Sequence, residues 1–354
     1  MQKSPYAPVF QLTRGAIVES ILYGSIAVVT SDGRLAAWYG NPKTITYLRS
    51  TAKPFQAMPF IESGGHKAYD LTEEEVAIIC ASHSGTDRHK AVITSIQAKA
   101  GILESDLLCG VHTPMDRDTA EALKQRGEEP TPNRHNCSGK HTGMVAFARL
   151  RGLPYSLPDH VYINPAHPIQ QEIIKTFSQM CGLKPGSVFI GIDGCSAPNF
   201  AVPLRNAALA FARLCDPGRL TKKRQAACRT ISQAMMANPV MVGGPGSFDT
   251  ELMKAAPGKI VCKGGAEGYQ GIGVMPGAVG PGSPAFGIAF KISDGDYRNQ
   301  ARSSVALEVL RQLNVLTKAE LHNLESFGPI FTLRNGRQLV VGQGYPAFQL
   351  QRPG

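Results

Sequence analysis

A serine and a lysine stand three residues apart in the stretch RSTAK, where Ser50 precedes Lys53. A serine hydroxyl is a weak nucleophile at neutral pH unless a base takes its proton, and a neutral lysine amine can be that base. Pro54 has no N–H, so a helix running on through Phe55 accommodates it only in the first turn, which predicts a helix start here. Residues three apart share a helix face, so the two side chains can act together. The alternative is a capping serine followed by a solvated lysine.

Two further stretches combine polar side chains with glycine. In CASHSGTDRH, from Cys80 to His89, Ser82 follows an apolar helical segment and precedes a glycine; the alternative is an ordinary helix stop followed by a new cap. In VCKGGAEG, Lys263 stands on a predicted strand that ends in a glycine turn, where a ligand or another backbone can approach closely. The alternative for Lys263 is an exposed lysine at a sheet edge.

Two stretches carry residue types that bind metals. NRHNCSGKHTG (133–143) holds two histidines, a cysteine and a lysine just before an apolar helix, and FIGIDGCSAP (189–198) ends a strand with Asp193 and Cys195. Thiolates bind zinc, and a single cysteine needs ligands from elsewhere in the chain, so Cys137 and Cys195 are candidate partners. Neither cysteine belongs to a C-x-x-C motif, so two buried structural thiols are the alternative.

The elements that must position these stretches fall into three blocks. The segment GSIAVVTSDGRLAAWYG predicts a strand pair turning at 31–33, and Asn335-Gly336 predicts a hairpin near the C-terminus. Helical periods are predicted at 52–63, after the Thr72 cap, and at 87–99, 117–127, 141–151, 167–181, 201–214, 222–237 and 296–313. Strands are predicted at 187–193, 259–262, 271–275 and 285–293.

Strands at both ends with helices between predict an α/β protein with one mixed, largely antiparallel sheet and an inserted helical region. We expect residues 1–50 and 243–354 to form the sheet-containing region and residues 51–242 to form a mainly helical one, with the site at their junction.

Composition excludes several classes of protein. The 354 residues are 43% hydrophobic and 18% charged, which predicts a soluble globular protein, and no apolar run approaches the roughly 20 residues of a membrane span. The formal charge is +10, but the basic residues are dispersed without interleaved aromatics, so we expect small anionic substrates and no nucleic acid. The eight scattered cysteines, without a secretory signal, predict free thiols and a cytoplasmic protein.

Taken together and in order, RSTAK, ASHSG, NCSGKH, GIDGCSAP and CKGGAEG resemble the Rhizobium etli-type, or class 3, L-asparaginases. That family is related in fold to the serine β-lactamases and penicillin-binding proteins, and its members are homodimers. The resemblance implies two nested serine-lysine pairs, Ser50 with Lys53 and Ser82 with Lys263. It implies one zinc ion held by Cys137, Lys140 and Cys195, with waters completing the coordination, and it implies substrate contacts from Arg49, His141 and Asp193.

The implied reaction is hydrolysis of the side-chain amide of L-asparagine to L-aspartate and ammonia. It needs a nucleophile, a base, donors for the oxyanion and a proton for the departing ammonia. Lysines sharing a desolvated site repel each other, which lowers a pKa and leaves one amine neutral. We expect zinc to orient the substrate or brace the 136–141 loop rather than to activate water. Two alternatives are a β-lactamase-like hydrolase or peptidase and a non-catalytic binding module on the same fold.

Overall fold

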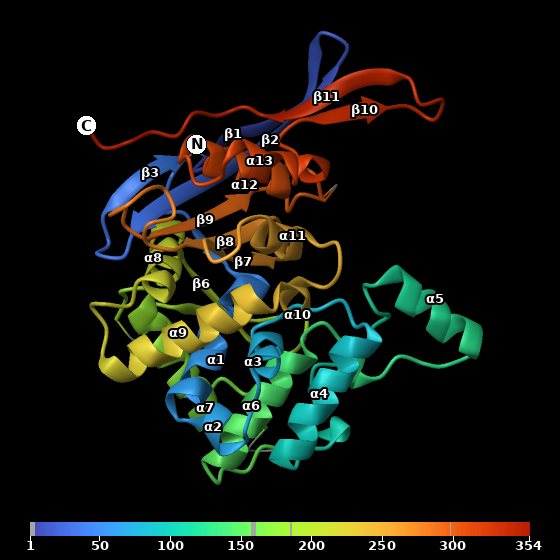
Figure 1. Ribbon diagram of the computed structural model, residues 1–354, viewed down its shortest axis with the longest axis vertical. Coiled ribbons are helices and arrows are strands. Elements are labelled where there is room, and N and C mark those ends of the chain that lie inside the picture. Colours follow the sequence, from blue (N-terminus) through green and yellow to red (C-terminus); the bar gives the residue numbers. More distant parts are fainter. Residues whose placement is uncertain (1–3, 157–160, 185, 298) are drawn as a thin grey trace. The chain divides into compact units, whose positions relative to one another are not determined.

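The computed structural model describes residues 4–156, 161–184, 186–297 and 299–354 (Figure 1). The chain divides into two compact units. The first comprises Met1–Thr51, Val202–Asp216 and Glu251–Gly354, and the second comprises Ala52–Ala201 and Pro217–Thr250. No helix in the described part of the chain is long and apolar enough to cross a membrane.

The first unit is built on an antiparallel sheet. Its strands are β1 (Ala7–Arg14), β2 (Ile17–Thr30), β3 (Leu35–Tyr39), β4 (Ile45–Tyr47), β7 (Ile260–Gly265), β8 (Tyr269–Val274), β9 (Phe286–Ile292), β10 (Phe331–Arg334) and β11 (Val340–Pro346). All but β4 share one sheet, in the order β10-β11-β1-β2-β9-β8-β7 with β3 paired to β2. Phe10 lies opposite Pro346 and Ser25 opposite Lys291, so the N-terminal strands β1 and β2 lie between strands from the C-terminal part of the chain. The predicted α/β class with a sheet built from both ends is confirmed.

One helix that the sequence placed in the helical region belongs to the sheet unit. Helix α8 (Leu204–Cys215) contacts β9, β2 and β8, and its apolar side is rich in alanine. Close packing requires a glycine on β9, because a Cβ on Gly287 would lie 1.7 Å from the carbonyl oxygen of Ala208. The start of the helix predicted at 201–214 is too early, because residues 201–203 end strand β6 and α8 begins after Pro203.

The remaining helices of the first unit lie near the C-terminus. They are α12 (Ala301–Gln312), which contacts β11, β1 and β8, the short α13 (Lys318–His322), and the 3-10 turn η5 (Glu325–Phe327). Helix α12 starts five residues later than predicted, because Asp296 accepts the backbone N–H groups of Gln300, Ala301 and Arg302. Helix α11 (Phe248–Ala255) carries the chain from the second unit into the first.

The second unit is mainly helical. Its helices are α1 (Lys53–Glu62), α2 (Gly65–Ala68), α3 (Glu73–Ile79), α4 (Asp87–Ala100), α5 (Arg117–Arg126), α6 (Ser138–Leu150), α7 (Pro168–Met180), α9 (Lys222–Ala237) and α10 (Pro239–Gly243), with 3-10 turns η2 (Glu104–Asp106) and η3 (Pro132–Arg134). Strand β5 (Phe189–Ile192) pairs antiparallel with β6 (Pro198–Pro203). In the core the ring of Phe177 stacks on Phe200 and lies tilted against Phe55, and α1 packs against α6, α7 and α9.

Local capping fixes the helix starts around the site. Helix α1 begins at Lys53 with Pro54 in its first turn, as predicted, and the 3-10 turn η1 (Arg49–Ala52) that carries Ser50 leads into it. The side chain of Thr72 accepts the N–H of Glu75, whose carboxylate accepts the N–H of Thr72, so the predicted Thr72 cap of α3 is confirmed and forms a capping box with Glu75.

Candidate active site

Lys53 is a buried lysine of the second unit whose side chain has three hydrogen-bond acceptors. Its side chain is 1% exposed, and its Nζ atom lies 2.6 Å from the carbonyl oxygen of Ala81, 2.8 Å from Ser82 Oγ and 3.3 Å from the carbonyl oxygen of Asn136. Three acceptors match the three hydrogens of an ammonium group. The structure therefore brings Lys53 onto Ser82, the serine that the resemblance assigns to the other pair. A solvated lysine, the alternative reading of RSTAK, is wrong.

The backbone at Ser82 is also engaged. Its N–H donates to the carbonyl oxygen of Val242 at 3.0 Å. Serine hydrolases often use the amide of the nucleophile as one oxyanion donor. In this arrangement the Ser82 amide has an acceptor already, so an oxyanion formed on Ser82 needs donors from other residues.

His83 links the Ser82 segment to the start of α6. Its Nδ1 atom accepts the N–H of Gly85 at 3.1 Å, so the ring hydrogen lies on Nε2, which donates to Ser138 Oγ at 2.9 Å. Ser138 in turn donates to the carbonyl oxygen of Asn133. Burial, with His89 and Lys53 nearby, holds the pKa of His83 well below its ordinary value, and the ring is neutral. The sequence placed His83 in a reactive stretch without giving it a role; its position next to Ser82 was the available signal.

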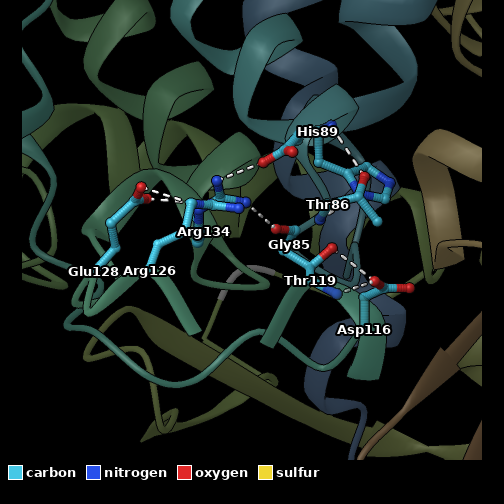
Figure 2. A network of polar contacts seen from close by, with 9 residues as sticks. Gly85, Thr86, His89, Asp116, Thr119, Arg126, Glu128 and Arg134 are labelled. Atoms are coloured by element: carbon cyan, nitrogen blue, oxygen red, sulfur yellow. Dashed lines mark hydrogen bonds and ion pairs between the residues drawn. The ribbon is translucent and has the colours of Figure 1, made fainter. Parts of the chain in front are cut away.

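A second set of contacts fastens the same loops (Figure 2). The buried guanidinium of Arg134 donates to the carbonyl oxygen of Gly85 at 3.0 Å and pairs with Asp87 at 2.5 Å. Asp116 caps α5 by accepting the N–H of Thr119 at 2.9 Å. Arg134 thus ties the 82–86 segment to the loop that leads into Cys137.

The three predicted metal ligands lie in one buried cluster. Lys140 Nζ is 2.8 Å from Cys195 Sγ, and Cys137 is at the cap of the same helix, α6. A hydrogen bond from Cys195 holds the pKa of Cys137 well below that of a free thiol. Burial acts in the opposite direction, and the nearby charges of Lys53 and Lys140 lower this pKa further. Burial by itself would lower the pKa of Lys140, but the sulfurs of Cys195 and Cys137 raise it above its ordinary value. The cluster is therefore a lysine ammonium beside thiolate sulfur.

This donor set suits zinc, with one condition. Two thiolates and an amine are ligands of the type that a tetrahedral zinc site uses, and the amine must lose a proton before it can bind. Among the described residues, no group of three or more His, Cys, Asp or Glu side chains is arranged to hold a metal ion. The cluster itself offers two side chains of those types, both cysteines, plus Lys140, so the zinc ion stays a prediction.

A third thiol adjoins the cluster. Burial, with Cys137 and Cys195 nearby, raises the pKa of Cys109 to about 12, so it is a neutral thiol. All eight cysteines are buried thiols, in agreement with the thiols predicted from the sequence.

The two predicted substrate contacts of this unit flank the cluster. His141 follows Lys140 on α6, and burial together with Lys140 lowers its pKa to about 4. Its Nδ1 atom lies 2.7 Å from the phenol oxygen of Tyr162, a residue the sequence gave no reason to select. Asp193 follows β5, accepts the N–H of Gly194 at 2.9 Å and helps to raise the pKa of Lys140. The carboxylate therefore belongs to the same electrostatic environment.

The first unit contains the other predicted residues, Arg49, Ser50 and Lys263. The hydroxyl of Thr51 donates to the carbonyl oxygen of Lys263 at 3.2 Å, so the RST turn touches strand β7. A Cβ on Gly265 would lie 2.5 Å from the carbonyl oxygen of Leu48, which explains the glycine in this turn. Lys263 is 1% exposed and its Nζ donates to the carbonyl oxygen of Gly264 at 2.7 Å. The alternative of an exposed edge lysine is therefore wrong.

Arg49 is held in an unusual backbone conformation. Its φ is +52°, which costs a non-glycine residue energy and persists where surrounding contacts enforce it. Its guanidinium pairs with Glu267 at 3.8 Å. The buried Lys291 donates to the carbonyl oxygens of Glu267 and Ile292, and burial lowers the pKa of Lys291. Lys291 is not among the residues predicted from the sequence, although a lysine inside the apolar run 285–293 was a usable signal.

The chain matches the model of a known protein family. A family model described as L-asparaginase II matches residues 10–345. No curated protein matches the chain. Among solved structures, the chain is similar to one described as Mglu, with 15% identity over 83% of this chain and 68% of that chain and a TM-score of 0.34. It is also similar to Mglu in its tris and glutamate form, with 14% identity over 83% of this chain and 60% of that chain and a TM-score of 0.35. A third similar structure is a probable glutaminase from Bacillus subtilis complexed with 6-diazo-5-oxo-L-norleucine, with 11% identity over 82% of this chain and 84% of that chain and a TM-score of 0.37.

The family match covers all five stretches on which the sequence resemblance rests, from RSTAK to CKGGAEG. The resemblance to asparaginases is thereby confirmed, and the chain belongs to the L-asparaginase II family.

Proposed function

We propose that this protein is an L-asparaginase that hydrolyses the side-chain amide of L-asparagine through a serine nucleophile activated by a lysine. The observation that carries the proposal is the contact of the buried Lys53 with Ser82, in a chain of the asparaginase family. A buried lysine held against a serine hydroxyl is the arrangement that a serine-lysine hydrolase requires.

The proposed reaction has two stages. In its neutral form, the lysine amine takes the proton of the serine hydroxyl while the oxygen attacks the amide carbon, giving a tetrahedral oxyanion. Collapse of this intermediate breaks the carbon–nitrogen bond, and the proton from the lysine leaves with ammonia. Water then attacks the ester with the same base, releasing aspartate and restoring the serine.

Two serines remain as proposed nucleophiles. Ser50 is the first choice from the RSTAK motif, with Lys53 as its base. Ser82 has the direct contact with Lys53, but its amide N–H already donates to Val242, which disfavours an oxyanion on Ser82. We therefore propose Ser50 as the acylated residue, with Ser82 as the alternative. Lys263 is the second proposed catalytic lysine, paired with Ser82.

The amino-acid head of the substrate offers two charges. We propose that Arg49 binds the α-carboxylate, that Asp193 binds the α-ammonium, and that His141 supplies a further contact. When zinc is bound, Cys137, Lys140 and Cys195 would hold it, and it would supply a fixed positive charge that orients the substrate. The β-lactamase-related fold, the homodimer and the cytoplasmic location also remain proposals.

The decisive experiment measures ammonia and aspartate released from L-asparagine by the purified protein and by Ser50→Ala and Ser82→Ala variants. Ser84→Ala is the matched control, because Ser84 lies in the same segment and its Oγ atom has no hydrogen-bond partner among the described residues. We expect turnover by the wild type and the control and a loss of several orders of magnitude in at least one of the other variants. No asparagine turnover by the wild type would reject the proposed function.

A further inference from the structure

His112 stands in the irregular segment that leads into helix α5, and its partly exposed ring bonds the backbone through both nitrogens. Its Nε2 atom lies 3.2 Å from the backbone nitrogen of Asn136, and its Nδ1 atom lies 2.6 Å from the carbonyl oxygen of Thr113. The ring therefore joins its own segment to the loop at Asn136, although the two residues are 24 positions apart in the chain.

The direction of both hydrogen bonds follows from the backbone partners. A backbone N–H can only donate, so Nε2 accepts from Asn136, and a carbonyl oxygen can only accept, so Nδ1 donates to Thr113. A neutral ring that carries its hydrogen on Nδ1 makes both contacts. Both ring nitrogens are thus occupied by the backbone, and His112 has none left to exchange a proton with a substrate.

The peptide groups on either side of Asn136 are both held by histidine rings. The preceding peptide donates its N–H to His112, and the following peptide donates the N–H of Cys137 to Nδ1 of His135 at 3.0 Å. The two rings lie against each other, with centroids 4.2 Å apart. Because each peptide group is planar, holding both planes fixes the two backbone dihedral angles between them, and with these the direction of the Asn136 carbonyl.

The carbonyl group fixed in this way contacts Lys53. Its oxygen lies 3.3 Å from Nζ, the longest of three contacts, after the carbonyl oxygen of Ala81 at 2.6 Å and Ser82 Oγ at 2.8 Å. The side chain of Cys137, which the same loop carries, interacts with Lys53 as well. A carbonyl oxygen can only accept, so it orients the amine whether that group carries two hydrogens or three. If the Asn136 carbonyl turned away, Nζ would keep one carbonyl partner and could rotate away from Ser82.

We propose that His112 is a positioning residue that holds the Asn136 carbonyl against Lys53 and so keeps the amine directed at Ser82. This role rests on the proposed function, because it takes Lys53 as the catalytic lysine. It adds a residue that lies outside all five stretches selected from the sequence. The ring acts through the backbone of Asn136. The alternative is a ring that only stacks on His135 and whose hydrogen bond to the loop is dispensable.

Two replacements of His112 separate the hydrogen bond from the stacking. His112→Phe keeps a flat ring against His135 and removes the acceptor, whereas His112→Gln offers an amide oxygen in place of Nε2. We expect His112→Phe to lower kcat for asparagine about 10-fold or more with a much smaller change in KM, because the displaced lysine slows the chemical step. His112→Gln should recover most of this loss. Val111→Ala, which shortens an exposed side chain of the same segment, is the control and should leave kcat unchanged. Equal losses in both His112 variants, or no loss in His112→Phe, would overturn the proposal.

Amide hydrogen exchange at Asn136 tests the hydrogen bond without any need for activity. Nuclear magnetic resonance should find this N–H protected in the wild type and in His112→Gln, and exchanging about 10-fold or more faster in His112→Phe. Unchanged exchange in folded His112→Phe would show that the ring does not hold the loop. Faster exchange with unchanged kcat would show that the loop does not position Lys53. Either result would overturn the proposal.

The tautomer of His112 provides a check in the wild-type protein. Long-range proton–nitrogen spectra distinguish the two tautomers, and the His112 signals are identified by their loss in His112→Gln. We expect the hydrogen on Nδ1, and a ring with its hydrogen on Nε2 would overturn the proposal, since it could not accept the N–H of Asn136. A wild-type protein that does not turn over asparagine would count against the proposed function, whereas the exchange rate and the tautomer would still decide whether His112 holds the loop.

Discussion

The Nζ atom of Lys53 lies 2.8 Å from the Oγ atom of Ser82, although the two residues are 29 positions apart in the chain. Lys53 opens helix α1 and Ser82 follows helix α3, so the packing of the second unit creates the pair. The first two predictions follow from this contact.

Replacing Lys53 by Met should lower kcat by about three orders of magnitude or more, because the base is removed while the buried volume is largely kept. Lys53→Arg keeps the charge but cannot supply a neutral amine, so it should be almost as inactive. Steady-state ammonia release measures both, and circular dichroism checks the fold. Substantial activity in folded Lys53→Met would contradict the proposed base.

The identity of the acylated serine should emerge from rapid quenching with asparagine followed by peptide mapping by mass spectrometry. We expect the added mass on the peptide that contains Ser50, because the amide of Ser82 is already bonded to Val242. The adduct should vanish in Ser50→Ala and persist in Ser84→Ala. An adduct on Ser82 would reverse the assignment.

Asparagine should be strongly preferred over glutamine. If Arg49 and Asp193 hold the head of the substrate at both charges, the extra methylene carries the glutamine amide past the nucleophile. A misplacement of about 1 Å can cost on the order of 100-fold, mainly in kcat. Kinetics on both amides check this, and comparable values of kcat/KM would exclude the fixed-head arrangement.

Elemental analysis of the purified protein should find about one zinc ion per chain if the zinc proposal holds. Cys137→Ala and Lys140→Met should each lose it, because among the described residues no three His, Cys, Asp or Glu side chains are arranged to hold the ion in their place. Cys228→Ala is a suitable control, as its thiol lies on α9 and its pKa is raised to about 12, chiefly by burial. Metal-free wild-type protein that keeps full stability and activity would remove zinc from the mechanism.

The free energy of unfolding should fall as the pH drops from about 6.5 toward 4. Burial, with His112 and Lys53 nearby, lowers the pKa of His135 to about 4, and His83 and His89 are shifted in the same direction. Between pH 4 and pH 6.5 the unfolded chain binds more protons than the folded one, so acid favours unfolding. The stabilisation that these neutral histidines contribute is fully present above the ordinary histidine pKa and is lost as the pH falls toward the lowered value.

Urea unfolding at a series of pH values measures this slope. His135→Asn should flatten it, because Asn keeps an acceptor near the backbone N–H of Cys137 but does not titrate. An equal slope in wild type and His135→Asn would refute the assignment.

Gly287→Ala should destabilise the first unit by roughly 1–3 kcal/mol or more, because the new Cβ would meet the backbone of α8 at 1.7 Å. Gly336→Ala should be nearly neutral, since no atom lies within 4 Å of the added carbon. Thermal unfolding compares the two, and equal stabilities would contradict the close packing of α8.

The sequence predicted those features that depend on neighbouring residues. Helix α9 has the bounds predicted from its period, and the Thr72–Glu75 box and the Pro54 start are as expected, because capping and proline act locally. The stretches rich in reactive residues were found for the same reason, since element ends carry sites.

The partners of these residues depend on tertiary packing and were harder to predict. Lys53 reaches Ser82 because α1 and α3 pack in one core, which no spacing in the sequence encodes. Tyr162 had no signal, as it lies in an irregular segment between helices. Strand β1 and the short strand β4 were also missed, although Phe10, Gln11, Leu12 and Thr13 of β1 alternate between apolar and polar residues.

The burial of every cysteine gives the molecule an internal reporter of its own opening. Cys215 and Cys262 lie in the first unit and the other six in the second. A thiol reagent can reach them only when the surrounding structure opens, so its rate of attachment at each site reads the free energy of local opening. Peptide mapping after timed alkylation would therefore rank the two units by the ease with which each one unfolds, in a native protein that carries no added probe.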